Sequence, residues 1–183
     1  SENELFVYSA PLSGFDGFLY QISGGNLIKI AGNTPGLTAQ ISNSGDYALI
    51  GAGDTNTIGM FMADIATNIG YESPVDTLPA KCVYDPQQET LVYCGVPDTL
   101  PEGAYPNDWL LGRVSFSDSI WLVSFENTSA TLISRLENEA GIPIDVSKPQ
   151  LNNSGSHLIF TNKNNLSLWS LQIREPDLET EGN

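Results

Sequence analysis

Apolar residues occur along this chain in short runs of roughly four to eight, bounded by Gly, Asn, Ser or Pro. Such boundaries are typical of β-strands, because Gly and Asn accept a positive φ in turns and Ser and Pro favour local chain reversal. A helical pattern is confined to residues 132–140, where a turn or two could form before Pro143 ends it. The pattern therefore predicts one all-β domain over residues 1–173, long enough to bury a sizeable core.

One sequence segment occurs twice in the chain, with substitutions. Residues 40–50 read QISNSGDYALI, and residues 150–160 read QLNNSGSHLIF. Each copy reads as a strand, an Asn-Ser-Gly turn and a second strand. Self-similarity of this kind indicates a repeat architecture.

Four apolar strands mark the repeat at intervals of roughly 40 to 60 residues, namely 17–22, 58–63, 119–124 and 166–171. With the turns, they resemble the WD40-like repeat of TolB-type β-propellers, which has Ser-Pro-Asp-Gly at the first turn and Ile-Trp in the third strand. The segments at those places are 42–45, 152–155, Ile120-Trp121 and Leu168-Trp169. Neither turn has the Pro-Asp pair, and the Trp-Asp dipeptide is absent from the chain. The resemblance implies a β-propeller-like fold of about four blades of antiparallel strands, and it says almost nothing about function.

The strand count leaves ring closure open. The first group lacks an opening strand, and the last group, which ends near Ile173, lacks a closing strand. Propellers often close by completing one blade with strands from both termini. The chain is therefore interpreted either as a complete small ring or as a fragment of a larger one. Residues 174–183 are predicted to form an acidic, disordered tail.

Seven basic residues against 22 acidic ones give a net charge of −15. Nucleic acid and anionic membrane surfaces would repel such a chain, so neither is expected as a partner. No stretch approaches the ~20 apolar residues of a membrane span. The charge favours solubility, with cation binding or adaptation to salt as the alternative. The calcium-loop pattern Asp-x-Asp/Asn-x-Asp/Asn-Gly is absent, and no metal or cofactor is predicted.

The two cysteines flank a predicted turn. Cys82 and Cys94 each lie six residues from Gln88, inside the polar stretch 85–89. Strands that fold back about Gln88 would place the two side chains opposite each other, at a separation close to that of a disulfide. The alternative is two buried thiols that act as small apolar groups. A disulfide would indicate an oxidising, extracytoplasmic compartment.

The best candidate site is the insertion 97–109, which contains three prolines. Loops on rigid scaffolds often carry function. Tyr105 and Trp109 resemble interface anchors, and Asp98 and Asp108 are the polar binding candidates beside them. The alternative is that Trp109 and the leucines that follow it fold back to cap a blade.

Sequence motifs for catalysis are weak. His157 is the only histidine, and it stands at the repeat position of Tyr47. No Gly-x-Ser-x-Gly elbow is present. Paired carboxylates such as Asp98, Glu102 and Asp108 could serve a glycosidase, but chance clusters are expected among 22 acids. No catalytic residue is predicted.

These observations favour a non-enzymatic, extracytoplasmic binding or scaffold module that recognises a protein or a glycan through its loops. The alternative is a propeller domain associated with a hydrolase whose catalytic part is elsewhere. A calcium-stabilised adhesin is a third hypothesis.

Overall fold

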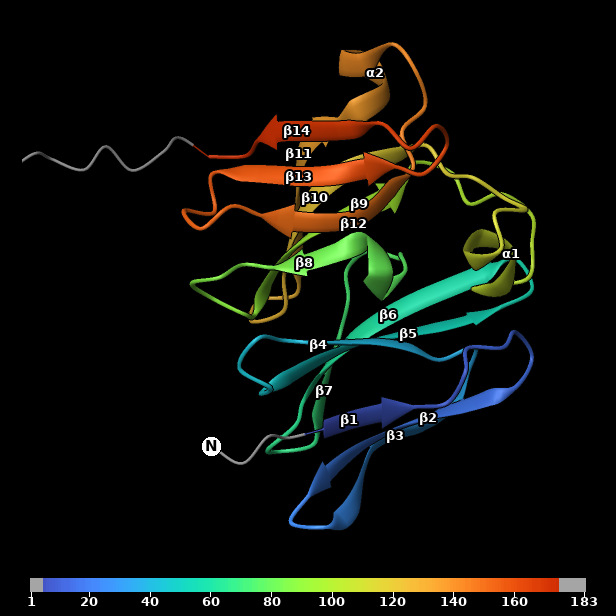
Figure 1. Cartoon of the computed structure of the whole chain (residues 1–183), viewed down its shortest axis with the longest axis vertical. Coiled ribbons are helices and arrows are strands. Elements are labelled where there is room, and N and C mark those ends of the chain that lie inside the picture. Colours follow the sequence, from blue (N-terminus) through green and yellow to red (C-terminus); the bar gives the residue numbers. More distant parts are fainter. Residues whose placement is uncertain (1–4, 175–183) are drawn as a thin grey trace, which may run out of the picture.

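The computed structural model describes residues 5–174, which form four separate antiparallel sheets (Figure 1). The first sheet contains β1 (Leu5–Tyr8), β2 (Asp16–Ser23) and β3 (Asn26–Pro35). The second contains β4 (Thr38–Ile41), β5 (Tyr47–Asp54), β6 (Thr57–Asp64) and β7 (Ile69–Glu72). The third contains β8 (Cys82–Tyr84), β9 (Leu91–Pro97), β10 (Asp118–Ser124) and β11 (Ser129–Arg135). The fourth contains β12 (Val146–Leu151), β13 (His157–Asn162) and β14 (Leu168–Gln172). The predicted all-β fold of antiparallel strands is confirmed.

The four sheets, called blades 1 to 4 in chain order, are stacked one beside the next. Their first strands, β1, β4, β8 and β12, lie along the same side of the stack (Figure 1). Blades 1 and 4 lie at opposite ends of the longest axis of the molecule. The described residues therefore form an open arc of four blades, and the interpretation as a closed small ring is wrong.

The position of β1 corrects the strand count of the first group. β1 lies beside β4, which is the first strand of blade 2, so β1 is the opening strand of blade 1 and β2 is the second. The expectation that this group lacks its opening strand is therefore wrong. Like blade 4, blade 1 has three strands within the described residues. An apolar run such as 17–22 is typical of any buried strand, so the sequence pattern does not distinguish a second strand from a third.

The repeated segment, residues 40–50 and 150–160, forms the same turn in blades 2 and 4. Ser42 Oγ accepts a hydrogen bond from Tyr47 N at 3.1 Å, and Asn152 Oδ1 accepts one from His157 N at 2.9 Å. The glycine of each turn has a positive φ, 84° in blade 2 and 65° in blade 4. Glycine adopts a positive φ at no steric cost, because it has no Cβ, and this favours Gly at that place in both copies.

Apolar clusters hold neighbouring blades together. Their buried members are Leu19, Leu37, Ala48 and Ile50 between blades 1 and 2, Leu49, Met62, Val92 and Val123 between blades 2 and 3, and Tyr93, Ile120, Val146 and Phe160 between blades 3 and 4. Blades 2 and 3 are covered on both faces. Their central strands therefore carry nearly continuous apolar runs, as buried strands do.

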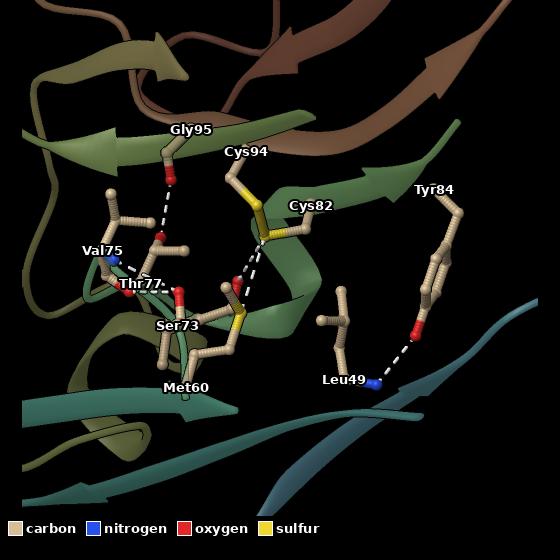
Figure 2. The surroundings of a disulfide bond; sticks show 10 residues. Leu49, Met60, Ser73, Val75, Thr77, Cys82, Tyr84, Cys94 and Gly95 are labelled. Atoms are coloured by element: carbon tan, nitrogen blue, oxygen red, sulfur yellow. Dashed lines mark hydrogen bonds between the residues drawn. A yellow bond between two sulfur atoms is a disulfide. The ribbon is translucent and has the colours of Figure 1, made fainter. Parts of the chain in front are cut away.

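The predicted disulfide is confirmed. Cys82 and Cys94 are directly opposed in the pairing of β8 with β9, their Cα atoms are 4.1 Å apart, and their sulfur atoms are bonded (Figure 2). The bond lies in the apolar cluster between blades 2 and 3. Next to it, the Tyr84 hydroxyl accepts a hydrogen bond from Leu49 N at 2.8 Å, which ties blade 3 to blade 2.

Within residues 5–174, helical structure is limited to η1 (Pro79–Lys81), α1 (Asn107–Leu110) and α2 (Leu136–Ala140). α2 lies inside the segment predicted to hold a helical turn, and it is capped at its C-terminus by Gly141, whose φ is 69°. Among the same residues, no helix is long and apolar enough to cross a membrane.

Arg174, the first residue of the predicted tail, is held by contacts with blade 3. Arg174 forms an ion pair with Asp85 and donates a hydrogen bond to the Tyr93 hydroxyl at 3.2 Å. Arg174 is therefore part of the folded domain. The rest of the predicted tail, residues 175–183, lies outside the described residues.

Candidate functional site

The insertion that follows β9 folds back onto blade 2. Tyr105 N donates to the Asp54 carbonyl at 3.1 Å, and Gly103 N donates to Asn56 Oδ1 at 2.8 Å. Gly53 permits this approach, because a Cβ there would lie 2.7 Å from the Tyr105 carbonyl oxygen. The insertion therefore links blade 3, where it arises, to the end of the β5–β6 hairpin in blade 2.

The two aromatic residues predicted as exposed anchors are buried. Tyr105 is 0% exposed and Trp109 is 4% exposed, and both rings pack on Phe116. The Tyr105 hydroxyl donates to the Pro101 carbonyl at 2.5 Å, so its polar end is satisfied inside the loop. The prediction of surface anchors is wrong for these side chains, because the loop folds back and hides its own aromatics. The alternative, in which Trp109 and the two leucines after it fold back, holds for Trp109, whereas leucines 110–111 are exposed.

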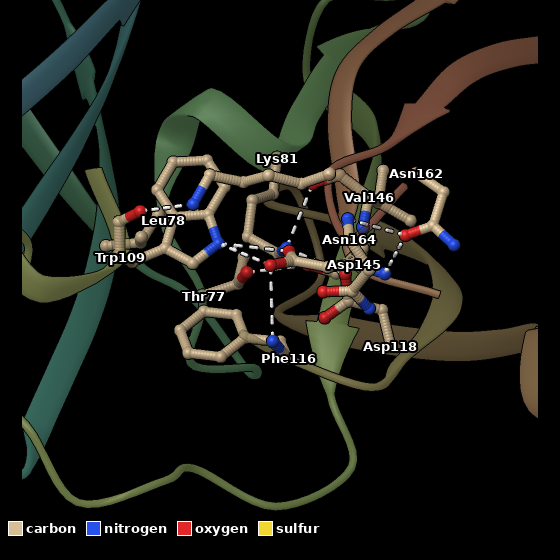
Figure 3. A network of polar contacts seen from close by, with 12 residues as sticks. Thr77, Leu78, Lys81, Trp109, Phe116, Asp118, Asp145, Val146, Asn162 and Asn164 are labelled. Carbon is tan, nitrogen blue, oxygen red and sulfur yellow. Dashed lines mark hydrogen bonds and ion pairs between the residues drawn. The ribbon is translucent and has the colours of Figure 1, made fainter. Parts of the chain in front are cut away.

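A buried ionic network lies beneath Trp109 (Figure 3). Lys81 Nζ lies 2.7 Å from Asp118 Oδ2 and 2.5 Å from Asp145 Oδ1, and all three side chains are fully buried. Lys81 ends η1 and Asp118 begins β10, both in blade 3, whereas Asp145 directly precedes β12 of blade 4. Lys81 Nζ also donates to the Val146 carbonyl at 2.9 Å. The network therefore joins blades 3 and 4.

Aromatic side chains seal the network from solvent. Trp109 Nε1 lies 3.0 Å from each carboxylate oxygen of Asp145, to which it donates. Phe116 N donates to Asp145 Oδ2 at 3.2 Å. Lys81 Nζ lies 5.0 Å from the centroid of the Trp109 ring and 4.8 Å from that of Phe116, which is within the range of a cation–π interaction. The buried charges thus have the dense set of partners that a stable buried ion pair requires.

Asp118 is the least satisfied member of this network. Its Oδ2 accepts a hydrogen bond from Val146 N at 2.6 Å, whereas its Oδ1 has no hydrogen-bond partner in the described part of the chain. Burial raises the pKa of Asp118 to about 6, because the loss of hydration outweighs the attraction of Lys81. A carboxyl with a shifted pKa can indicate a functional site. Here the side chain is inaccessible to solvent, so we assign the network a structural role.

The acidic candidates of the insertion hold the loop in place. Asp108 Oδ2 accepts from Ala104 N at 2.8 Å, and its Oδ1 pairs with Arg113 at 3.1 Å. Asp98 Oδ1 accepts from Ser119 Oγ at 2.7 Å, which fastens the insertion to β10. In residues 5–174, no three His, Cys, Asp or Glu side chains gather as a metal site would require. The structure thus gives Asp98 and Asp108 local structural partners.

A groove of about 320 Å³ runs along the first strands of the blades and brings all four blades together with helix α1. Its lining includes Tyr8 from β1, Thr38 and Gln40 from β4, Leu110 from α1 and Lys148 from β12. The pairing of β12 with β13 shifts register between Ser147 and Gln150, and Lys148 has a φ of 52° inside this bulge. Bulges commonly redirect a side chain at a functional edge.

The chemistry of the groove is mixed. Tyr8 and Leu110 are exposed and offer apolar surface, whereas Lys148 contributes an exposed ammonium group. Thr38 Oγ1 is buried and has no hydrogen-bond partner among the described residues. Apolar walls with a few convergent polar groups are typical of ligand sites.

The sequence pattern predicted neither the groove nor the buried ionic network. The lining residues Tyr8, Gln40 and Lys148 come from three blades, and no spacing rule connects positions so far apart in sequence. Lys81 and Lys148 are two of only seven basic residues, which is the one signal that could have marked them.

Comparisons with solved structures agree with this fold. Kuenenia stuttgartiensis hydrazine synthase is similar with a TM-score of 0.61 and 16% identity, over 92% of this chain and 49% of that chain. TolB from Acinetobacter baumannii is similar with a TM-score of 0.50 and 13% identity, over 87% of this chain and 38% of that chain. This chain therefore spans half or less of the proteins it matches, and at such identities the likeness shows the fold alone. The resemblance to TolB-type propellers is confirmed at that level. No protein-family model and no curated protein matches the chain.

Proposed function

We propose that this protein is a non-enzymatic binding or scaffold module that acts outside the cytoplasm and recognises a protein or a glycan. The observation that carries this proposal is the groove along the first strands, where four blades and helix α1 contribute side chains to one concave surface. A rigid stack of sheets can hold such a surface in one geometry without rearrangement on binding, which lowers the entropic cost of recognition.

Recognition would combine apolar contact with a few polar groups. The exposed Tyr8 ring offers a face for a sugar ring or an apolar side chain. Lys148 supplies a positive charge in a chain of net charge −15, so a carboxylate on the ligand would gain a partner there. Helix α1, which begins in the insertion, contributes Leu110 to this surface in place of the aromatic anchors expected from the sequence.

The Cys82–Cys94 disulfide supports a location outside the cytoplasm. Structural disulfides form and persist in oxidising compartments and are rare where thiols are kept reduced. Its burial between blades 2 and 3 gives it the character of a structural bond.

A non-enzymatic role is supported by the positions of the titratable side chains. The insertion carries Asp98 and Asp108, and both carboxylates accept hydrogen bonds that hold the loop in place. The Lys81 network is closed to solvent. His157 Nδ1 lies 2.9 Å from Ser156 Oγ within the repeat turn.

The proposal is tested by probing arrays of neutral and acidic glycans and of extended peptides with the labelled protein. We expect Tyr8→Ala and Lys148→Glu each to weaken binding of the best array probe by about tenfold or more. Tyr71→Ala is the matched control, because Tyr71 is a partly exposed tyrosine on β7 outside the groove. Equal binding by all three variants would rule out the groove as the site, and turnover of a bound probe would contradict the non-enzymatic role.

A further inference from the structure

The outer face of blade 1, on the side away from blade 2, is apolar. It carries Leu5, Val7, Phe18, Tyr20, Ile22 and Leu27. The strand pairing places these side chains on one face, because Leu5 and Leu27 both oppose Ile22, and Val7 opposes Tyr20. The alternate residues of the same strands, Leu19 and Phe6, pack against blade 2. We call the first set the blade 1 outer face.

The blade 1 outer face is continuous and open. Leu5 is 56% exposed and Leu27 is 61% exposed. Ile22 lies between these two leucines, and farther along β2 the rings of Phe18 and Tyr20 stack with their centroids 6.3 Å apart. An exposed apolar patch of this kind on a soluble protein commonly marks an interaction site.

The outer face of blade 4, at the other end of the arc, has a different chemistry. The strand pairing places on it mostly polar side chains, namely Gln150, His157, Thr161, Ser170 and Gln172, together with Ile159 and Leu168. Terminal repeats that face water carry a polar outer face. Blade 4 therefore has the composition of an end that faces solvent, whereas blade 1 does not.

Charge indicates what can cover the blade 1 outer face. Within residues 5–174, the charged members of this face are Lys29, which opposes Tyr20, and Asp16, two residues before Phe18, and their charges cancel. The whole chain has a net charge of −15. Two copies can therefore bring these faces together without placing like charges opposite each other. A twofold arrangement also makes Lys29 of each copy available to Asp16 of the other.

We propose that a second copy of this chain covers the blade 1 outer face, in a twofold dimer in which two sheets pack face to face. Aligned sheets pack about 10 Å apart through interdigitated apolar side chains. The alternative contact, blade 1 of one copy on blade 4 of another, would bury polar side chains of blade 4 without partners, which is unfavourable. Tyr8, which lines the groove, opposes Leu19 and so belongs to the other face of β1.

The test is the molar mass of the chain in solution, measured by light scattering and sedimentation from about 1 to about 200 µM. We expect a dimer that strengthens with added salt, because salt screens the repulsion between two acidic copies. Leu27→Asp should weaken the dimer by at least about tenfold, because it places a carboxylate in the apolar contact. Leu168→Asp is the matched control, since Leu168 is also an exposed leucine on the outer face of an end blade and is 75% exposed.

Leu5→Asp provides a second variant at an exposed position of the same face, in case Leu27→Asp affects folding, which circular dichroism would reveal. A monomer across the whole concentration range would overturn the proposal. Dissociation caused equally by Leu168→Asp would also overturn it, in favour of a head-to-tail contact between blades 1 and 4.

Discussion

Lys81 shows how a charged side chain is retained in the interior of this protein. Its ammonium group is surrounded by two carboxylates, one backbone carbonyl and two aromatic rings. A buried cation without such partners would lose its proton or destabilise the fold. The network holds two carboxylates for one ammonium group, so one negative charge is poorly compensated. Burial is the main cause of the raised pKa of Asp118, and the neighbouring charge of Asp145 adds to it.

Asp118→Asn should change how stability depends on pH. Because the folded-state pKa is raised from 3.8 to about 6, the folded protein keeps a proton between these values that the unfolded chain releases. The stability contributed by neutral Asp118 is therefore present below pH 4 and is lost as the pH rises through 6. We expect the free energy of unfolding of the variant, relative to the original protein, to rise by on the order of 2 kcal/mol between pH 4 and pH 7. Urea unfolding at a series of pH values measures this; parallel curves for the two proteins would contradict it.

At the scale of elements, the β8–β9 hairpin combines a local turn with a covalent bond. Asp85 Oδ1 accepts from Gln87 N at 2.8 Å, which shapes the turn. The resulting register places Cys82 directly opposite Cys94. Because β8 has only three residues, few backbone hydrogen bonds hold it to β9, and the disulfide fixes the pairing. The strand also carries Tyr84, which contacts blade 2, so the hairpin influences packing beyond its own blade.

Removal of the disulfide should destabilise the domain. The cysteines are 12 residues apart, and closing a loop of that length restricts the unfolded chain enough to contribute about 3 kcal/mol. We expect Cys82→Ala with Cys94→Ala to lower the free energy of unfolding in urea by that amount. Reduction of the original protein breaks the bond but keeps both sulfur atoms, so it measures the loss of the bond alone. We expect a similar decrease in the free energy of unfolding. Free thiols in protein unfolded without reductant would contradict the bond itself.

At the scale of the whole molecule, the insertion ties three blades together. It arises from blade 3, pairs with the β5–β6 end of blade 2 through Tyr105, and reaches Asp145 at the start of blade 4 through Trp109. Sheet-to-sheet packing alone connects each blade only to its immediate neighbours. The insertion adds a connection across blades 2, 3 and 4 of an arc that is open at its ends.

Trp109→Ala should weaken this connection. A large buried aromatic replaced by alanine typically costs about 3–5 kcal/mol, and the loss of its N–H leaves Asp145 with fewer donors. Trp109→Phe keeps most of the volume and removes only the donor, so we expect a loss of about 1–2 kcal/mol. Urea unfolding measures both, and hydrogen exchange should rise in residues 103–108 and in the paired segment 54–57. An increase confined to the insertion would show that it does not support blade 2.

The sequence by itself determined the local features of this protein. The repeat turns follow from a polar side chain and a glycine at fixed offsets, and the apolar runs follow from strands covered on both faces. The Cys82–Cys94 pair follows from the symmetry of one hairpin, since both partners lie within the reach of a single turn. These features depend on neighbours in sequence, so a pattern can reveal them.

Only the tertiary structure decided what lies between the blades. Tyr105 and Trp109 looked like surface anchors because a polar, proline-rich loop surrounds them, yet the fold of that loop against blades 2 and 4 buries both rings. The groove joins Tyr8, Thr38 and Lys148, which lie on different blades. The open arc likewise depends on how four sheets stack. Such contacts arise between residues that are distant in sequence, and no local pattern encodes their distance in space.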